Sequence, residues 1–93
     1  DQVVLLDVRE PEEYSEIHFK YSVLIPLGDL MAHSEQSLKK TDRIVIYCAH
    51  GIRSLHALMG LRNLGFENLR SLRGGMAAWE EQYGISRTSR SEG

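Results

Sequence analysis

The sequence is short of several residue types, and each shortage excludes a class of protein. It has one cysteine among 93 residues, so no disulfide can form within the chain and no second thiol could resolve an oxidised one. This suits a reducing compartment, and we expect a cytoplasmic protein. No apolar run approaches the length of a membrane span. No signal peptide is visible either, and the start at Asp1 rather than methionine is consistent with an absent upstream segment.

An excess of charge of one sign is also missing. The 11 basic and 13 acidic residues leave a net charge of −2, which gives no reason to expect a nucleic acid or an anionic membrane as the partner. Hydrophobic residues make up 42% of the chain and charged residues 26%, as in an ordinary globular domain. The length predicts one domain with a single modest core.

The most informative stretch surrounds Cys48. An apolar, β-branched run at residues 44–47 ends in this cysteine, and a helical pattern begins soon afterwards at Ile52. The pattern predicts a strand, a tight loop and a helix, with the thiol at the end of the strand. Loop N–H groups and the helix dipole would then favour the ionised thiol, which is the nucleophilic form.

The ordinary alternative is a cysteine that acts as a small hydrophobe in the core. Two features favour the reactive interpretation. Gly51 lies in the middle of the loop, where a positive φ or a close backbone approach is expected. Arg53 and Ser54 open the helix, and Arg53 supplies a permanent cation that could hold an anionic substrate.

Apolar runs alternate with helical patterns along the whole chain. Their alternation through short loops predicts an α/β fold with a mainly parallel central sheet and helices on both faces. Within the third helix, the expected buried face consists of Leu55, Leu58, Met59, Leu61 and Leu64. The expected strands are residues 3–6, 23–25, 44–47 and 69–72, and the expected helices are residues 10–17, 30–38, 52–64 and 76–83.

Three motifs carry a family resemblance. Residues 48–54, C-A-H-G-I-R-S, resemble the active-site loop of rhodanese (sulfurtransferase) domains, whose pattern is C-x-x-G-x-R-S/T. Residues 7–14, D-V-R-E-P-E-E-Y, resemble the first motif of that family, and residues 72–79, L-R-G-G-M-A-A-W, resemble its last. The resemblance implies a rhodanese-like domain over residues 1–84, without the strand and helix that usually come first. The polar residues 85–93 lack an apolar pattern and predict a flexible tail.

The chain departs from the family after the first motif. Where a G-H-I-x-G-A-type stretch is usual, residues 17–22 read I-H-F-K-Y-S, so Ile17 and Tyr21 replace the two glycines. A positive φ at either position would be strained. His18 matches the family and is expected to be a hydrogen-bonded turn residue. Trp79, in the last motif, is expected to fix the last helix against the sheet.

The loop and the resemblance together predict sulfur transfer by covalent catalysis. The Cys48 thiolate would attack the sulfane sulfur of thiosulfate or a protein persulfide, and the new persulfide would pass its sulfur to a thiol, cyanide or another thiophilic acceptor. Arg53 would orient the loop and bind the anion, and the Ser54 hydroxyl would donate to sulfur or cap the helix. His50 either sets a pH-dependent preference for anionic donors or has no role. The predicted binding residues, whose amides would stabilise the persulfide anion, are Ala49, His50, Gly51, Ile52, Arg53 and Ser54.

Two residues after the first strand are expected to support this site. Asp7 would hydrogen-bond the backbone of a neighbouring loop, and Arg9 would pair with a carboxylate such as Glu13. Neither is a plausible proton carrier for sulfur transfer. We expect no bound metal and no cofactor.

Two rival functions stay open. Phosphatases and arsenate reductases of the related C-x5-R type need a longer loop around a tetrahedral oxyanion, whereas here four residues separate Cys48 from Arg53. A carrier module is the other rival. It would accept sulfur from a cysteine desulfurase-like donor and pass it to an adenylating enzyme of a thiamine, molybdopterin or tRNA-thiolation pathway.

Overall fold

A central parallel sheet organises the molecule. The computed structural model describes residues 3–83 and 88–89. The sheet contains β1 (Val3–Asp7), β3 (Val23–Leu24), β4 (Arg43–Tyr47) and β5 (Leu69–Ser71) in the order β3-β1-β4-β5, and each neighbouring pair is parallel. Because β1 and β4 pair in parallel along their full lengths at the centre, their carboxyl ends meet at one edge of the sheet.

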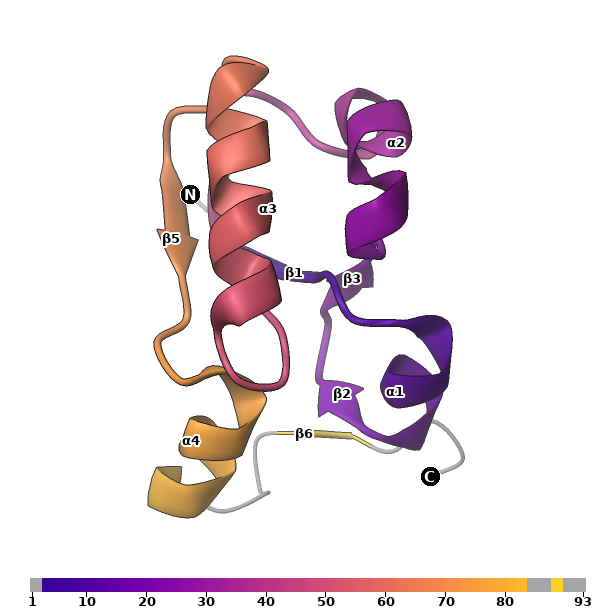
Figure 1. The fold of residues 1–93 in the computed structure, drawn as a ribbon, viewed down its shortest axis with the longest axis vertical. Coiled ribbons are helices and arrows are strands. Elements are labelled where there is room, and N and C mark those ends of the chain that lie inside the picture. The colour runs from indigo at the N-terminus through magenta and orange to yellow at the C-terminus, as the bar shows by residue number, and fades with distance from the viewer. Residues whose placement is uncertain (1–2, 84–87, 90–93) are drawn as a thin grey trace.

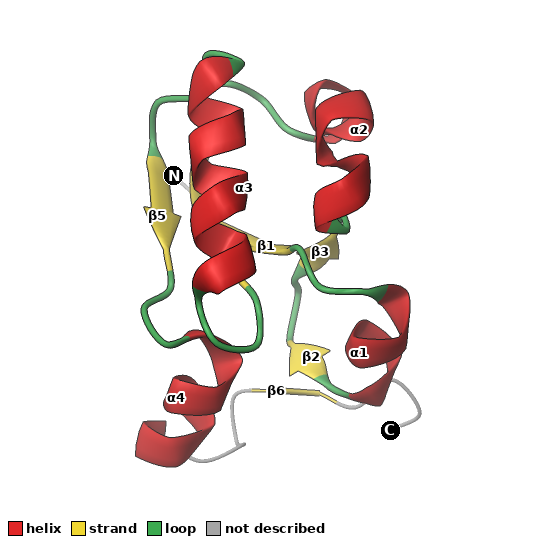
Figure 2. Ribbon diagram, in the orientation of Figure 1, coloured by secondary structure: helices red, strands yellow, loops and turns green. Residues whose placement is uncertain are grey.

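Helices connect these strands (Figure 2). They are α1 (Pro11–Glu16), the short 3-10 helix η1 (Leu27–Asp29), α2 (Leu30–Ser37), α3 (Ile52–Asn63) and α4 (Gly75–Tyr83). The predicted alternation of strand and helix is confirmed, with boundaries within one residue of those expected. None of the described helices combines the length and the hydropathy that crossing a membrane requires.

A small antiparallel pair was not predicted. It consists of β2 (His18–Phe19) and β6 (Thr88–Ser89). The hydroxyl of Tyr47 accepts a hydrogen bond from the Phe19 backbone N–H at 3.1 Å and therefore ties β2 to the central sheet. The predicted tail over residues 85–93 lies mostly outside the described residues; Thr88 and Ser89 within it form β6, which pairs with β2.

The main core lies between the sheet and the pair α2 and α3, which pack side by side over one face (Figure 1). Alternate side chains of a strand point to the same face, which gives each strand one row of residues in this core. Cys48 belongs to it, so packing fixes the end of β4 beside α3. The buried members are Leu6, Val8, Ile25, Leu30, Leu38, Ile44, Ile46, Cys48, Ala57, Leu61 and Phe66.

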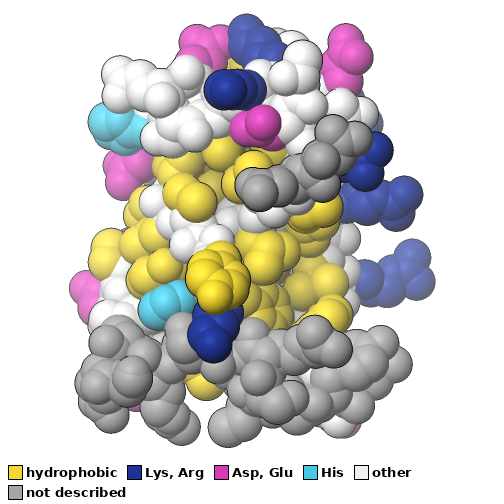
Figure 3. Space-filling view, turned by 180° about the vertical axis from the view of Figure 1, so that it is seen from behind, with side chains coloured by type: hydrophobic (Ala, Val, Ile, Leu, Met, Phe, Trp, Pro, Cys, Tyr) yellow, Lys and Arg dark blue, Asp and Glu magenta, His cyan; other side chains and the backbone are white. Residues whose placement is uncertain are grey.

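The opposite face carries a smaller cluster. Phe19, Tyr47 and Met76 are buried there, and Trp79 of α4 meets Phe19 edge-on at 5.6 Å between ring centroids. Trp79 thus packs α4 against this face, and helices lie on both faces of the sheet, as predicted. Beside the cluster is an open apolar hollow of about 590 Å³, lined partly by Leu5, Val45 and Leu72; Figure 3 shows the apolar surface of this side.

The predicted buried face of α3 is partly wrong. Leu55 and Met59 are 52% and 58% exposed, whereas Ser54, Ala57 and Leu61 are buried. These three lie on one helical stripe, because residues three and four apart share a face. The small side chains of Ser54 and Ala57 let the start of α3 approach the sheet closely, which places a hydroxyl rather than a leucine beside Cys48.

The two replaced glycines have different outcomes. Ile17 is extended, with φ −161° and ψ 143°, and is unstrained. Tyr21 has φ 66° and is the sole non-glycine residue with positive φ within the described ranges. Its side chain is 89% exposed, so its backbone conformation is set by the turn and not by packing of the ring.

Candidate active site

The sulfur of Cys48 lies among backbone donors at the carboxyl end of β4. The N–H of Gly51 donates to Sγ at 3.1 Å, and the N–H of Ser54 donates at 3.3 Å. Gly51 has φ 102°, as predicted, and directs the loop into α3, which begins at the next residue. Cys48 is 1% exposed, so these hydrogen bonds are shielded from bulk water.

This environment favours the thiolate. Burial raises the pKa of Cys48, because a buried anion loses its hydration. Hydrogen bonds from the Ser54 hydroxyl and from the backbone N–H groups of Ser54, Gly51 and His50 outweigh burial, and the pKa of Cys48 lies below its ordinary value. A buried cysteine that served only as a hydrophobe would instead be held in the thiol form.

The start of α4 holds the loop in shape. The N–H groups of Met76 and Ala77 donate to the carbonyls of Cys48 and Ala49 at 2.8 and 3.0 Å, which satisfies donors that a helix N-terminus leaves unpaired. Gly75 has φ 66°, and a Cβ there would lie 2.5 Å from the Cys48 carbonyl oxygen. Gly75 belongs to the last motif, but its role, which is to let α4 contact the Cys48 loop, is visible in the structure alone.

Arg53 has a partner that the sequence did not reveal. Its guanidinium forms two hydrogen bonds to the Glu13 carboxylate, at 2.7 and 2.9 Å. These bonds are the chief reason that the pKa of Glu13 falls to about 2. The pKa of Arg53 is raised, first by Glu13 and to a smaller extent by the charges of Cys48 and Glu10. Arg53 therefore lies close enough to interact electrostatically with the thiolate, while both of its terminal nitrogens are hydrogen-bonded to Glu13.

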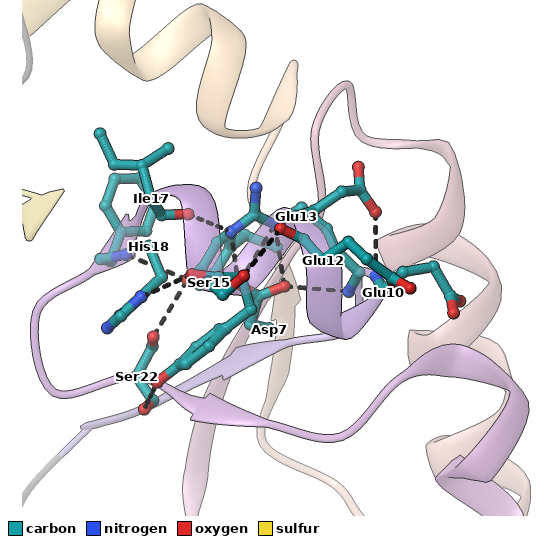
Figure 4. A network of polar contacts seen from close by, with 12 residues as sticks. Asp7, Glu10, Glu12, Glu13, Ser15, Ile17, His18 and Ser22 are labelled. Carbon is teal, nitrogen blue, oxygen red and sulfur yellow. Dashed lines mark hydrogen bonds and ion pairs between the residues drawn. The ribbon is translucent and has the colours of Figure 1, made fainter. Parts of the chain in front are cut away.

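Arg9 pairs with a carboxylate, as predicted, but its partner is Asp7 and not Glu13, the example that the sequence suggested. The Asp7 carboxylate accepts the Arg9 backbone N–H at 2.9 Å and side-chain N–H groups at 2.8 to 3.2 Å. Arg9 also donates to the Ile17 carbonyl at 2.7 Å, so this cation links the end of β1 to the end of α1. Figure 4 shows the Asp7 carboxylate and the Ile17 carbonyl on this network. Asp7 does bind backbone, but that of its own loop.

The remaining predicted residues divide by exposure. Ala49 is half-buried, whereas His50 and Ile52 are exposed, and a role of His50 in the choice of donor stays a prediction. Ser54 is fully buried, and its hydroxyl oxygen lies 2.7 Å from that of Ser71 on β5. Ser71 was missed because the weak alternation of residues 69–72 did not indicate which side chain would face α3.

His18 is held by two contacts with Tyr14. Its Nδ1 lies 2.8 Å from the carbonyl oxygen of Tyr14, and its ring stacks on the Tyr14 ring with 3.8 Å between centroids. The prediction of a hydrogen-bonded residue is confirmed, although His18 belongs to β2 and not to a turn.

The chain matches the Rhodanese-like domain family over residues 1–82. It is 37% identical over 84 residues to the probable adenylyltransferase/sulfurtransferase MoeZ of Mycobacterium tuberculosis, an overlap of 87% of this chain and 21% of that protein. It is 31% identical over 84 residues to the thiosulfate sulfurtransferase GlpE of Coxiella burnetii, with 90% and 78% covered. The chain thus spans about a fifth of one relative and most of the other.

Solved structures agree with the family match. The solution structure of the rhodanese-like domain of the Alr3790 protein from Anabaena sp. superposes with a TM-score of 0.87 at 33% identity, covering 97% of this chain and 67% of that one. The fold of this chain is therefore one already known from a solved rhodanese-like domain. By fold and by sequence, the chain belongs to the rhodanese-like domain family.

Proposed function

We propose that this chain is a sulfurtransferase domain in which Cys48 carries sulfur as a persulfide. The observation that carries the proposal is the convergence of the Gly51 and Ser54 N–H groups on Cys48 Sγ. Donors arranged in this way stabilise sulfur as an anion without reorganising during the reaction. The names of the relatives, an adenylyltransferase/sulfurtransferase and a thiosulfate sulfurtransferase, support the same chemistry.

The reaction proceeds in two half-reactions. The Cys48 thiolate attacks the outer sulfur of thiosulfate, the donor S–S bond breaks, and sulfite leaves with the bonding electron pair. Cyanide or a thiolate then attacks the outer sulfur of the Cys48 persulfide, the new S–S bond breaks, and the Cys48 thiolate is restored. Each step is a nucleophilic displacement at sulfur, and no external oxidant is needed. Ping-pong kinetics follow from this order.

A second candidate is the sulfur-carrier role, and one observation favours it. Arg53, the cation of the loop, is bound at both ends of its fork by Glu13, so its charge is largely compensated before a donor arrives. The doubly charged thiosulfate gains less from such a site than from a free arginine. A persulfidated protein, which brings its own binding surface, depends less on that charge. A cysteine desulfurase as donor and an adenylating enzyme as acceptor fit this role.

A phosphatase function is less well supported. Four residues separate Cys48 from Arg53, and the arginine that would clamp an oxyanion turns to Glu13 instead. The short loop leaves a cradle that suits one sulfur atom better than a phosphate group.

A cytoplasmic location stays a prediction from the cysteine content.

The experiment compares donors on one protein. The kcat/KM for thiosulfate with cyanide is measured beside that for a persulfidated protein donor, with Cys48→Ser as the blank. We expect turnover from both donors to require Cys48 and the protein donor to be the faster. Turnover that survives in Cys48→Ser would contradict the proposal, and Cys48-dependent hydrolysis of an aryl phosphate would favour a phosphatase.

A further inference from the structure

The hydroxyl of Ser54 has two neighbours that compete for its single hydrogen. Ser54 is fully buried, its oxygen lies 2.7 Å from the Ser71 oxygen, and its own N–H already donates to Cys48 Sγ. A hydroxyl donates one hydrogen and accepts two, whereas a thiolate only accepts. Once Cys48 is ionised, the Ser54 hydrogen is best directed at sulfur, which leaves the Ser54 oxygen to accept from Ser71.

We propose that Ser71 is a positioning residue, whose hydroxyl donates to Ser54 Oγ and thereby turns the Ser54 hydrogen toward Cys48 Sγ. The inference rests on the proposed function in taking the Cys48 thiolate as the working nucleophile. It adds a residue from a different strand, outside the motif that contains the cysteine. Ser71 does not touch sulfur and acts through Ser54 alone.

Ser71 is well placed to fix a hydroxyl because it lies on the sheet. In the register of β4 and β5, Ser71 stands opposite Ile46, two residues before Cys48, and the next residue, Leu72, donates its N–H to the Ile46 carbonyl at 2.8 Å. Pairing with β4, the strand that leads to Cys48, therefore also fixes the position of Ser71 along the sheet. A donor held by a sheet loses little entropy when it forms its hydrogen bond.

Without Ser71, the Ser54 hydroxyl has other acceptors. Ser54 lies in the first turn of α3, where a serine hydroxyl can donate back to the backbone carbonyl three or four residues earlier, here Gly51 or His50. If the Ser54 hydroxyl donates its hydrogen to one of these carbonyls, it cannot donate to Cys48 Sγ. The Ser71 hydrogen bond also polarises the Ser54 hydroxyl, because hydrogen bonds in a chain strengthen one another. A hydrogen bond from the Ser54 hydroxyl lowers the pKa of Cys48, so we expect a change in the direction of that hydroxyl to be detected at the thiol.

The charged groups around the loop are the same in every variant of the test. They are Arg53 on α3, Glu13 and Glu10 at the start of α1, and His50 in the loop itself. None of these side chains hydrogen-bonds Ser71 in the structure. A change in the Cys48 titration on mutation of Ser71 therefore reports the hydroxyl and not a displaced charge.

The experiment titrates the Cys48 thiolate by its ultraviolet absorbance, as a difference from Cys48→Ser. We expect Ser71→Ala to raise the titration midpoint by about half a pH unit and Ser54→Ala by about one unit, since a hydrogen bond to a charged group is worth more than one kcal/mol. The side chains of threonine and valine have the same shape, but only threonine has a hydroxyl. Ser71→Thr should therefore keep the wild-type midpoint, and Ser71→Val should match Ser71→Ala. This pair decides the matter even if Ser71→Ala does not fold.

Ser34→Ala is the matched control. Ser34 is also fully buried, but it lies in α2 and its hydroxyl has no hydrogen-bond partner within the described residues, so its loss should leave the midpoint unchanged. An unchanged midpoint in Ser71→Val, or equal midpoints in Ser71→Thr and Ser71→Val, would overturn the role of Ser71. Because the titration involves no sulfur donor, it can fail while Cys48-dependent sulfur transfer succeeds, and the reverse.

Discussion

Two arginine–carboxylate pairs stand near the carboxyl end of the central strands, and they differ in burial. The Arg9 and Asp7 side chains are 5% and 0% exposed, whereas those of Arg53 and Glu13 are 35% and 34% exposed. The first pair is closed on all sides, with Arg9 also bonded to the Ile17 carbonyl. The second faces solvent beside the cysteine loop. We therefore expect the buried pair to act in stability and the half-exposed pair to act in substrate binding.

The two pairs differ in role because separating their charges costs different amounts of free energy. A buried charge that loses its partner has neither water nor a counter-ion, so breaking such a pair is strongly destabilising. A half-exposed charge that loses its partner is rehydrated, and the pair adds little to stability. We therefore expect an anionic donor to displace Glu13 from Arg53 but not Asp7 from Arg9.

The largest expected effect is that of Asp7→Ala. It leaves the Arg9 guanidinium buried without its carboxylate, and we expect the free energy of unfolding to fall by about 3–5 kcal/mol. That is a large part of the total for a domain of this size. Urea unfolding measures the loss, and the rate of Cys48 alkylation per folded molecule should stay near that of the wild type.

Arg9→Ala with Asp7→Ala forms the control. When both partners are removed, no unpaired charge is left, so the double variant should be more stable than the sum of the two single losses predicts. A loss below about 1 kcal/mol in Asp7→Ala would show that the pair behaves like an exposed one and would remove the contrast between the pairs.

The smaller expected effect is that of Glu13→Gln. Solvent screens this pair, so we expect it to lose less than about 1 kcal/mol at neutral pH. The pKa of Glu13 is lowered from 4.5 to about 2, so the contribution of the pair is fully present above about pH 4.5 and is lost as the pH falls through 2. Urea unfolding at a series of pH values should show the wild type and Glu13→Gln converging in acid.

Glu13→Gln also removes the charged partner of the Arg53 guanidinium, so it tests whether Arg53 binds the donor. The KM for thiosulfate should fall in this variant, and Arg53→Met should raise it. A stability gap between Glu13→Gln and wild type that does not shrink as the pH falls through 2, or a KM that rises in Glu13→Gln, would show that Glu13 is as structural as Asp7.

Local signals were enough to predict the parts of the site that are close in sequence. The β-branched run before Cys48, the glycine at position 51 and the polar start of α3 each act over a few residues, and each is found where expected. Strand and helix boundaries followed for the same reason, because periodicity and terminating residues are local properties.

The pairings across the fold could not be predicted. Glu13 and Arg53 are 40 positions apart, and Ser54 and Ser71 are 17 apart, so their contacts depend on how α1, α3 and β5 pack. Arg9 pairs with Asp7 and not with Glu13 because both Arg9 and Asp7 are buried at the end of β1. The sequence does not show which charged side chains are buried. The face of α3 was misjudged likewise, since leucine spacing does not reveal that small residues at its start admit closer packing.

The central claim is that Cys48 carries sulfur. The most direct measurement is the intact mass of the protein after incubation with thiosulfate, under non-reducing conditions, beside Cys48→Ser. A persulfidated cysteine desulfurase serves as a second donor. The account predicts a gain of one sulfur atom in the wild type, its loss on addition of cyanide, and no gain in Cys48→Ser. A wild-type mass that stays unchanged with both donors would contradict it.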